Sequence, residues 1–154
     1  MTTATTRATR TPEPPGPDFL EFVWVWNSQA GQGTPPVHRR VLRWLEGRRA
    51  AGDHRLLLMA FRGCGKSTLV GLWCAWILLR DPQARILVLA ADAALATRMV
   101  ANVRRVLTRH PLCAHLLPDG PGEWAADRFT VAGLGKDIAT NVGLNYTAVV
   151  FTGV

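Results

Sequence analysis

The chain has 154 residues, of which 48% are hydrophobic and 19% charged, a composition typical of a globular protein and not of a disordered one. Its longest apolar run, Leu69 to Leu79, is too short to cross a bilayer, and the polar N-terminus lacks the apolar core of a secretory signal. The formal net charge of +7 favours acidic partners such as nucleic acid, although a high arginine content alone gives the same balance. Three cysteines without a Cys-x-x-Cys pair argue against a zinc site or a disulfide framework and indicate a reducing cytoplasm.

The first 50 residues divide into a tail and a helical segment. Residues 1–17 are rich in Thr and Pro and nearly free of apolar side chains, so we expect a disordered tail. Residues 18–50 are expected to form a helical segment, with two helices joined by a loop in "NSQAGQGTPP". Asp18 is placed to cap a first helix, whose apolar face comprises Phe19, Phe22, Val23 and Trp26. A second helix is expected to begin at Thr34-Pro35 and to end near Gly47.

Arginines crowd the second helix and the residues that follow it. Between residues 38 and 55, six arginines stand against only Glu46 and Asp53. One interpretation is a solvated helix face, and the other is a surface that contacts nucleic acid or a partner. The sequence leaves both open.

Residues 51–154 have the pattern of an α/β core. An apolar strand is expected at 56–60, a glycine-containing loop at 61–65 and a helix at 66–80. A second buried strand, "ARILVLAAD", precedes a helix at 92–108 whose inward face is Ala96, Met99, Val100, Val103, Val106 and Leu107. A short helix and turn follow in "HPLCAHLLPDGPG", and further strands are expected in "RFTV" and "YTAVVF". Strands alternating with helices predict βαβ units and a mainly parallel sheet.

The loop before the helix at 66–80 carries a phosphate-binding pattern. The usual pattern is G-x-x-x-x-G-K-[ST], and here "AFRGCGKS" has Ala60 in the first position. A loop that opens a helix directs backbone N–H groups at one point, at the positive end of the helix dipole. Gly63 and Gly65 leave room for an anion to approach this backbone. The sequence therefore predicts a nucleotide-phosphate site made of Ala60, Arg62, Gly63, Cys64, Gly65, Lys66, Ser67 and Thr68.

Each polar residue of this pattern has an expected role. Lys66 reaches the β- and γ-phosphate oxygens, and the Ser67 hydroxyl holds Mg²⁺. Thr68 is expected near the ligand and not on the metal. Cys64 is a small filler of the loop, or else a reactive thiol whose alkylation blocks nucleotide binding. Arg62 either packs on the surface or reaches the γ-phosphate during catalysis.

The segments "FRGCGKSTLVGLWCAWILL", "RILVLAADAALATRMVANVRRVL", "HPL" and "EWAADRFTV" together resemble the ATPase half of tailed-phage terminase large subunits. The similarity runs from about Phe19 to Val131 and includes the upstream "TPPVHRRVLRWLE". The resemblance implies a RecA-like P-loop NTPase fold, a three-layer sandwich with a mainly parallel sheet, followed in the family by a nuclease domain. It implies catalytic roles for Lys66 and Arg62.

The resemblance also implies partners and a location. It implies ATP and Mg²⁺ as cofactors, and double-stranded DNA, driven into procapsids at the expense of ATP, as the substrate of the motor. The terminase small subunit, the portal protein and further copies of the large subunit are the implied protein partners. The implied location is the cytoplasm of a bacterial host, with no membrane partner.

The chain departs from this family where hydrolysis requires acids. An Asp for the Mg²⁺ shell and a Glu to activate water are expected after the strand "YTAVVF", which is followed only by Thr152-Gly153-Val154. Asp92 is placed to cap a helix, with a replacement metal ligand as the alternative, and Glu123 and Asp127 are not paired with the phosphate site. The core is thus expected to be incomplete at its C-terminus and to lack the nuclease domain. Nucleotide binding is then more plausible than turnover, and the alternatives are a helicase-like P-loop fragment and a non-catalytic remnant or interaction protein.

Overall fold

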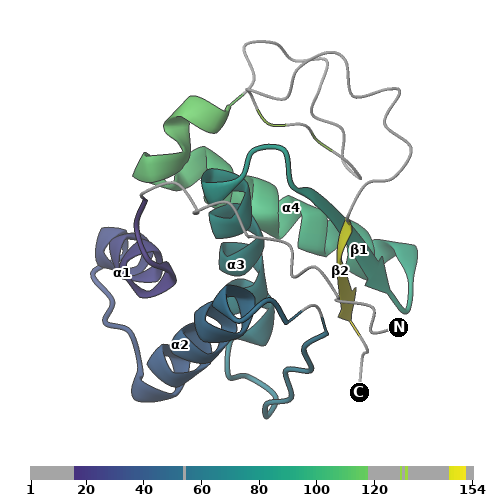
Figure 1. Ribbon diagram of the computed structural model, residues 1–154, viewed down its shortest axis with the longest axis horizontal. Coiled ribbons are helices and arrows are strands. Elements are labelled where there is room, and N and C mark those ends of the chain that lie inside the picture. Colours follow the sequence, from purple (N-terminus) through teal and green to yellow (C-terminus); the bar gives the residue numbers. More distant parts are fainter. Residues whose placement is uncertain (1–15, 54, 118–128, 130, 132–145, 152–154) are drawn as a thin grey trace, which may run out of the picture.

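The computed structural model describes residues 16–53, 55–117, 129, 131 and 146–151, with only the backbone of the last range. In chain order the elements are α1 (Phe19–Gln29), α2 (Pro36–Ala50), α3 (Lys66–Arg80), β1 (Arg85–Ala90), α4 (Ala93–Arg109), the 3-10 helix η1 (Pro111–Leu116) and β2 (Tyr146–Phe151). Helix α3 occupies the centre, and α1, α2 and α4 lie around it (Figure 1). No helix in the described part of the chain is long and apolar enough to cross a membrane.

Helix α1 begins where Asp18 caps it, as the sequence predicts. The Asp18 carboxylate accepts a hydrogen bond of 2.6 Å from the N–H of Glu21. Phe19, Phe22 and Val23 are buried and Trp26 is half-buried, so the predicted apolar face does point to the core. Capping fixes the first turn, and burial of this face holds the helix to the rest of the molecule.

Helix α2 continues past Gly47, where the sequence analysis placed its end. The actual end is a Schellman motif around Gly52, whose φ is 81°. The N–H of Gly52 donates to the carbonyl of Arg49 at 2.9 Å, and the N–H of Asp53 donates to that of Arg48 at 3.0 Å. The prediction was wrong because two glycines were available and only Gly52 takes the left-handed conformation that ends a helix.

Helix α3 is the most deeply buried element. Its core side chains are Leu69, Leu72, Trp73, Cys74, Ala75, Trp76, Ile77 and Leu78. The ring centroids of Phe19 and Trp73 are 4.9 Å apart, and those of Trp73 and Trp76 are 5.0 Å apart. Because residues from α1 to Val131 share this single core, the N-terminal helical segment packs together with the predicted ATPase core.

The two strands β1 and β2 pair in parallel, from Arg85 opposite Tyr146 to Ala90 opposite Phe151. The predictions of strands in "ARILVLAAD" and "YTAVVF" are therefore confirmed, but the predicted burial of the first was wrong, since Leu87 and Leu89 of β1 are each 46% exposed. Helix α4 follows β1 in the chain and packs on both β1 and α3. Met99, Val103, Val106 and Leu107 are buried, while Ala96 and Val100 on the predicted inward face are half-buried.

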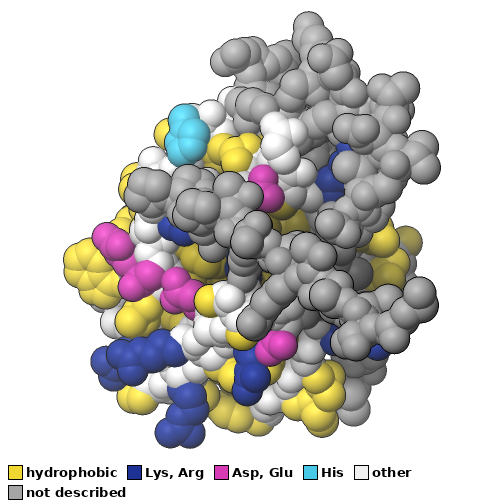
Figure 2. Space-filling view, in the orientation of Figure 1, with side chains coloured by type: hydrophobic (Ala, Val, Ile, Leu, Met, Phe, Trp, Pro, Cys, Tyr) yellow, Lys and Arg dark blue, Asp and Glu magenta, His cyan; other side chains and the backbone are white. Residues whose placement is uncertain are grey.

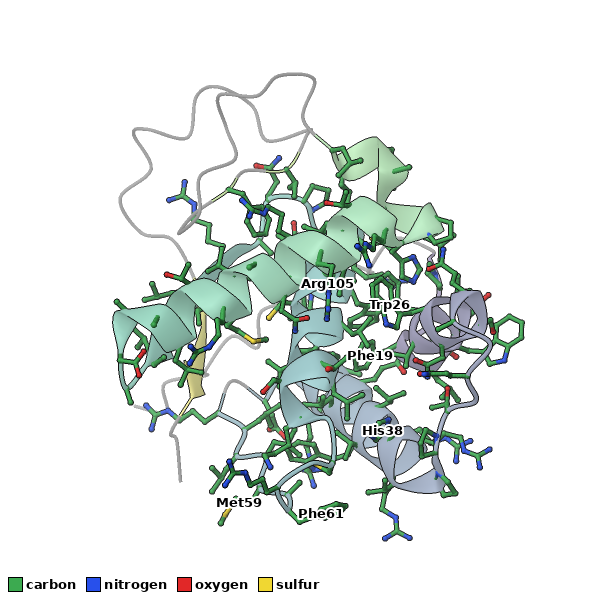
Figure 3. The ribbon with its side chains drawn as sticks, turned by 180° about the vertical axis from the view of Figure 1, so that it is seen from behind. Phe19, Trp26, His38, Met59, Phe61 and Arg105 are labelled. Atoms are coloured by element: carbon green, nitrogen blue, oxygen red, sulfur yellow. The ribbon has the colours of Figure 1, made fainter. Side chains whose placement is uncertain are left out.

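The strand predicted at 56–60 is absent, and this prediction was wrong. The segment forms no strand, and the exposed fractions of its side chains include 77% for Leu57 and 81% for Met59. The neighbouring Phe61 is 67% exposed, and Figure 3 shows Met59 and Phe61 at the outer rim of the molecule. A buried parallel strand needs a hydrogen-bonded neighbour and cover on both faces, and the described residues supply neither here.

Some predictions fall outside the described residues. These are the tail up to residue 15, Glu123, Asp127 and most of "RFTV", of which Phe129 forms a single bridge and Val131 is buried. The three-layer P-loop fold as a whole stays a prediction.

Candidate phosphate-binding loop

The candidate site is the turn that leads from residue 61 into α3. Gly63 and Gly65 have φ angles of 88° and 79°, in the left-handed region that side-chain-bearing residues avoid. Gly65 is the N-cap residue, so α3 begins at Lys66 as predicted. The two glycines therefore allow the chain to coil tightly just before the helix starts.

Backbone donors collect at this end of α3. The helical hydrogen bonds start with the N–H of Leu69, which donates to the carbonyl of Gly65 at 3.0 Å. The N–H groups of Lys66, Ser67 and Thr68 lie ahead of this first bond, as the first donors of any α-helix do. Ser67 and Thr68 are exposed, so an anion can reach them from solvent. Together with the helix dipole, these donors favour negative charge.

The Lys66 ammonium lies over the loop. Its Nζ donates to the carbonyl oxygens of Ala60 at 2.5 Å and Phe61 at 2.8 Å. The side chain thus turns back over the entry to the loop instead of extending into solvent. An ammonium held there is placed to meet an anion that binds the N–H groups of the loop.

Two side chains from other helices hold the loop and the first turn of α3 from outside. His38 of α2 donates from Nε2 to the carbonyl of Cys64 at 2.7 Å, and Asn102 of α4 donates from Nδ2 to the carbonyl of Ser67 at 2.8 Å. Arg105 in turn donates to Asn102 Oδ1 at 2.7 Å. His38 and Arg105 can be followed in Figure 3. Neither contact was predicted from the sequence, because a polar residue on a helix gives no sign of which distant carbonyl it meets.

The remaining predicted residues are placed as follows. Arg62 is exposed and Cys64 is half-buried, both within the loop. Asp92 caps α4, where its carboxylate accepts a 2.6 Å hydrogen bond from the N–H of Leu95, so the capping interpretation is confirmed. No group of three His, Cys, Asp or Glu side chains that could hold a metal occurs among the described residues.

The three cysteines are free thiols, and they differ in accessibility. Cys74 and Cys113 are buried in the core, and burial raises the pKa of each thiol to about 12. Neither can form a thiolate near neutral pH. Cys64, in the loop, is the accessible one.

A basic surface covers α2. Arg39, Arg40 and Arg43 are exposed, and Figure 2 shows Lys and Arg side chains gathered at the lower left of the molecule, where Figure 1 places α2. Further along, Arg48 pairs with Asp53 at 3.3 Å and Arg49 lies 5.9 Å from the ring centre of Trp76. Arg39, Arg40 and Arg43 therefore present positive charge to solvent from the first part of α2, and Arg48 near its end is also exposed although it pairs with Asp53.

Comparison with known proteins gives one informative similarity. No protein-family model matches the sequence, and no solved structure is matched. Over 75 residues the chain is 35% identical to the terminase large subunit of Enterobacteria phage T3, a match that covers 48% of this chain and 13% of the phage protein. The chain thus carries a segment similar to a terminase large subunit and spans a small part of that protein's length.

Proposed function

We propose that the chain is an ATP-binding module of a terminase-type DNA-packaging motor. The observation that carries the proposal is the turn of Gly63 and Gly65 at positive φ, with the Lys66 ammonium over it and α3 starting directly behind. The similarity to a phage terminase large subunit supports the choice of motor. The parallel pair β1 and β2, with α4 following β1, agrees with a P-loop sandwich.

Different residues of the loop and of the first turn of α3 contact different parts of the Mg·ATP. The N–H groups from Gly65 to Thr68 bind the β-phosphate, and Lys66 exchanges one or both of its carbonyl contacts for phosphate oxygens. Arg62 is exposed in the same loop, within the segment that would face a γ-phosphate. The Ser67 hydroxyl, exposed in the first turn of α3, fits the position of a Mg²⁺ ligand. Bound Mg²⁺ would neutralise charge on the phosphates.

Turnover requires carboxylates that the described residues do not bring to this loop. Asp92 is committed to capping α4. We therefore propose nucleotide binding by this chain and little or no hydrolysis by it alone. Phosphate release well above background in the presence of Mg²⁺ would show that a catalytic acid is present elsewhere.

The test is the binding of Mg·ATP by the wild type and by Lys66→Ala, followed with a fluorescent ATP analogue. The variant is expected to bind at least about tenfold more weakly, because it loses a charge-assisted contact to phosphate. Arg109→Ala removes an exposed positive charge from the last turn of α4 and serves as the control for net charge. Equal affinity of the wild type and Lys66→Ala would refute the proposed site.

A further part of the proposal is contact with double-stranded DNA through the exposed arginines of α2. The phosphate backbone is bound mainly through Lys and Arg, and Arg39, Arg40 and Arg43 are exposed on one short stretch of helix. This surface suits a partner that is held by its charge and not by its base sequence.

A further inference from the structure

We propose that His38 is a positioning residue that sets the orientation of the Cys64–Gly65 peptide group in the phosphate-binding loop. The inference rests on the proposed nucleotide site and adds to it a contact from helix α2. His38 lies on α2, 26 positions before Cys64, yet its Nε2 is 2.7 Å from the Cys64 carbonyl oxygen. A distant side chain therefore holds the backbone of the loop.

The imidazole ring of His38 also lies directly against Gly65. A side-chain carbon placed on Gly65 would be 3.4 Å from His38 Nε2 and 3.5 Å from Cε1. An added side-chain carbon would thus make only ordinary van der Waals contact with the ring, and the φ of 79° is what favours glycine at this position. His38 is half-buried in this contact.

The trans geometry of the Cys64–Gly65 peptide group determines the direction of the Gly65 N–H. In a trans peptide the C=O and the following N–H point to opposite sides, and no described peptide bond is cis. Because the Cys64 carbonyl is drawn towards His38, the N–H of Gly65 points away from the ring. That direction leaves it available to an anion, together with the N–H groups at the start of α3.

The loop needs such a constraint because glycine does not provide one. A glycine after the peptide lets the peptide plane rotate at little cost, and a rotation of about half a turn would direct the Cys64 carbonyl oxygen at the anion instead. In the described part of the chain, the side chain of His38 forms a hydrogen bond to the Cys64 carbonyl. Because the partner is a carbonyl oxygen, the hydrogen of this bond is on Nε2 of His38.

The experiment compares four variants in binding of a fluorescent ATP analogue with Mg²⁺, with pyrophosphate as competitor. His38→Ala removes the donor, and His38→Gln restores an N–H donor of similar reach. His38→Asn keeps the amide but is one methylene shorter, and His115→Ala is the control at an exposed histidine of η1. Melting of each free variant is recorded to separate folding from binding.

We expect His38→Ala and His38→Asn to bind ATP and pyrophosphate about tenfold more weakly, which corresponds to the loss of one hydrogen bond of about 1.4 kcal/mol. His38→Gln and His115→Ala should stay within about threefold of the wild type, by the same scale. A contact that only stabilised the fold would lower the melting temperature of the Ala and Asn variants but would not separate these variants from His38→Gln in nucleotide binding.

The outcomes distinguish this inference from the proposed function. If neither the wild type nor Lys66→Ala binds nucleotide, the proposed function fails. If the wild type binds, Lys66→Ala does not, and His38→Asn binds as well as His38→Gln, only the role of His38 is refuted. Should His38→Ala fail to fold, the Gln and Asn variants decide the question.

Discussion

Asn102 of α4 joins the first turn of α3, where its side-chain Nδ2 donates to the carbonyl of Ser67 at 2.8 Å. The two helices approach closely enough there because position 71 is glycine. A Cβ at position 71 would overlap Nδ2 of Asn102 and crowd its Cγ. The contact of Asn102 with Ser67 and Gly71 therefore affects both the orientation of the candidate loop and the packing of α3 against α4.

Gly71→Ala is expected to destabilise the protein by about 1–3 kcal/mol, since Asn102 must leave Ser67 to make room. Gly47→Ala is the matched control, because Gly47 also lies inside a helix but has nothing within 4 Å of the added methyl. It is expected to stabilise by about 0.5–1 kcal/mol. Urea unfolding followed by circular dichroism measures both. If both substitutions stabilised the protein, or if both destabilised it, this account would be contradicted.

His110 makes stability depend on pH. Its Nε2 donates to the carbonyl of Phe22 at 2.9 Å, while Nδ1 accepts from the N–H of Leu112 at 3.2 Å, so the neutral ring is the form that fits. Burial lowers the pKa of His110 from 6.5, and the hydrogen bond to Phe22 opposes this shift. The unfolded chain then binds the proton more readily. Stability is full above the unfolded pKa of 6.5 and falls as the pH drops towards the lower folded value.

The variant His110→Asn tests this dependence. Asparagine can still cap η1 through its side-chain oxygen but does not titrate. We expect it to be less stable than the wild type at pH 7.5 and to lose less stability between pH 7 and pH 5. Because the other histidines are shared, the difference between the two stability curves isolates His110. Parallel curves would rule out the assignment.

Cys64 should be the thiol that reacts in the native protein. Cys74 and Cys113 are buried with pKa values of about 12, whereas Cys64 is half-buried in the loop. A thiol reagent at pH 8 is expected to modify one cysteine rapidly, and three after denaturation. Saturating Mg·ATP should slow the fast reaction, and Cys64→Ser should abolish it. Fast loss of two thiols would contradict the packing of the core.

Arg39 and Arg43 lie one helical turn apart on α2 and are both exposed. Replacing both by Ala is expected to weaken binding of a short duplex DNA and to lower the slope of log affinity against log salt by about 1.8, from about 0.9 per phosphate contact. Fluorescence anisotropy across a salt series measures it. The double variant Arg98→Ala and Arg109→Ala on α4 has the same net charge. Identical slopes for the two pairs would show that α2 is not the contact surface.

Local rules accounted for much of the fold. The Asp18 and Asp92 caps, the start of α3 at Lys66 and the apolar face of α4 follow from side-chain chemistry within a few residues, and the structure has them. The prediction of a strand at 56–60 was wrong because strand formation depends on neighbouring strands and packing partners, and not only on the segment's own apolar side chains. The predicted end of α2 was wrong because the sequence offers two glycines and does not show which of them ends the helix. His38 and Asn102 could not be predicted, since their contacts span 26 and 35 positions.

The burial of α3 places two enclosed tryptophans on the helix that follows the candidate loop. Trp73 and Trp76 lie about two to three turns along the helix that Lys66 begins, and they are only 8% and 2% exposed. Close packing around the helix would carry a displacement of its first turn to these two rings. Intrinsic indole emission therefore offers a label-free optical signal of events at the loop, with no dye attached to the nucleotide or to the chain.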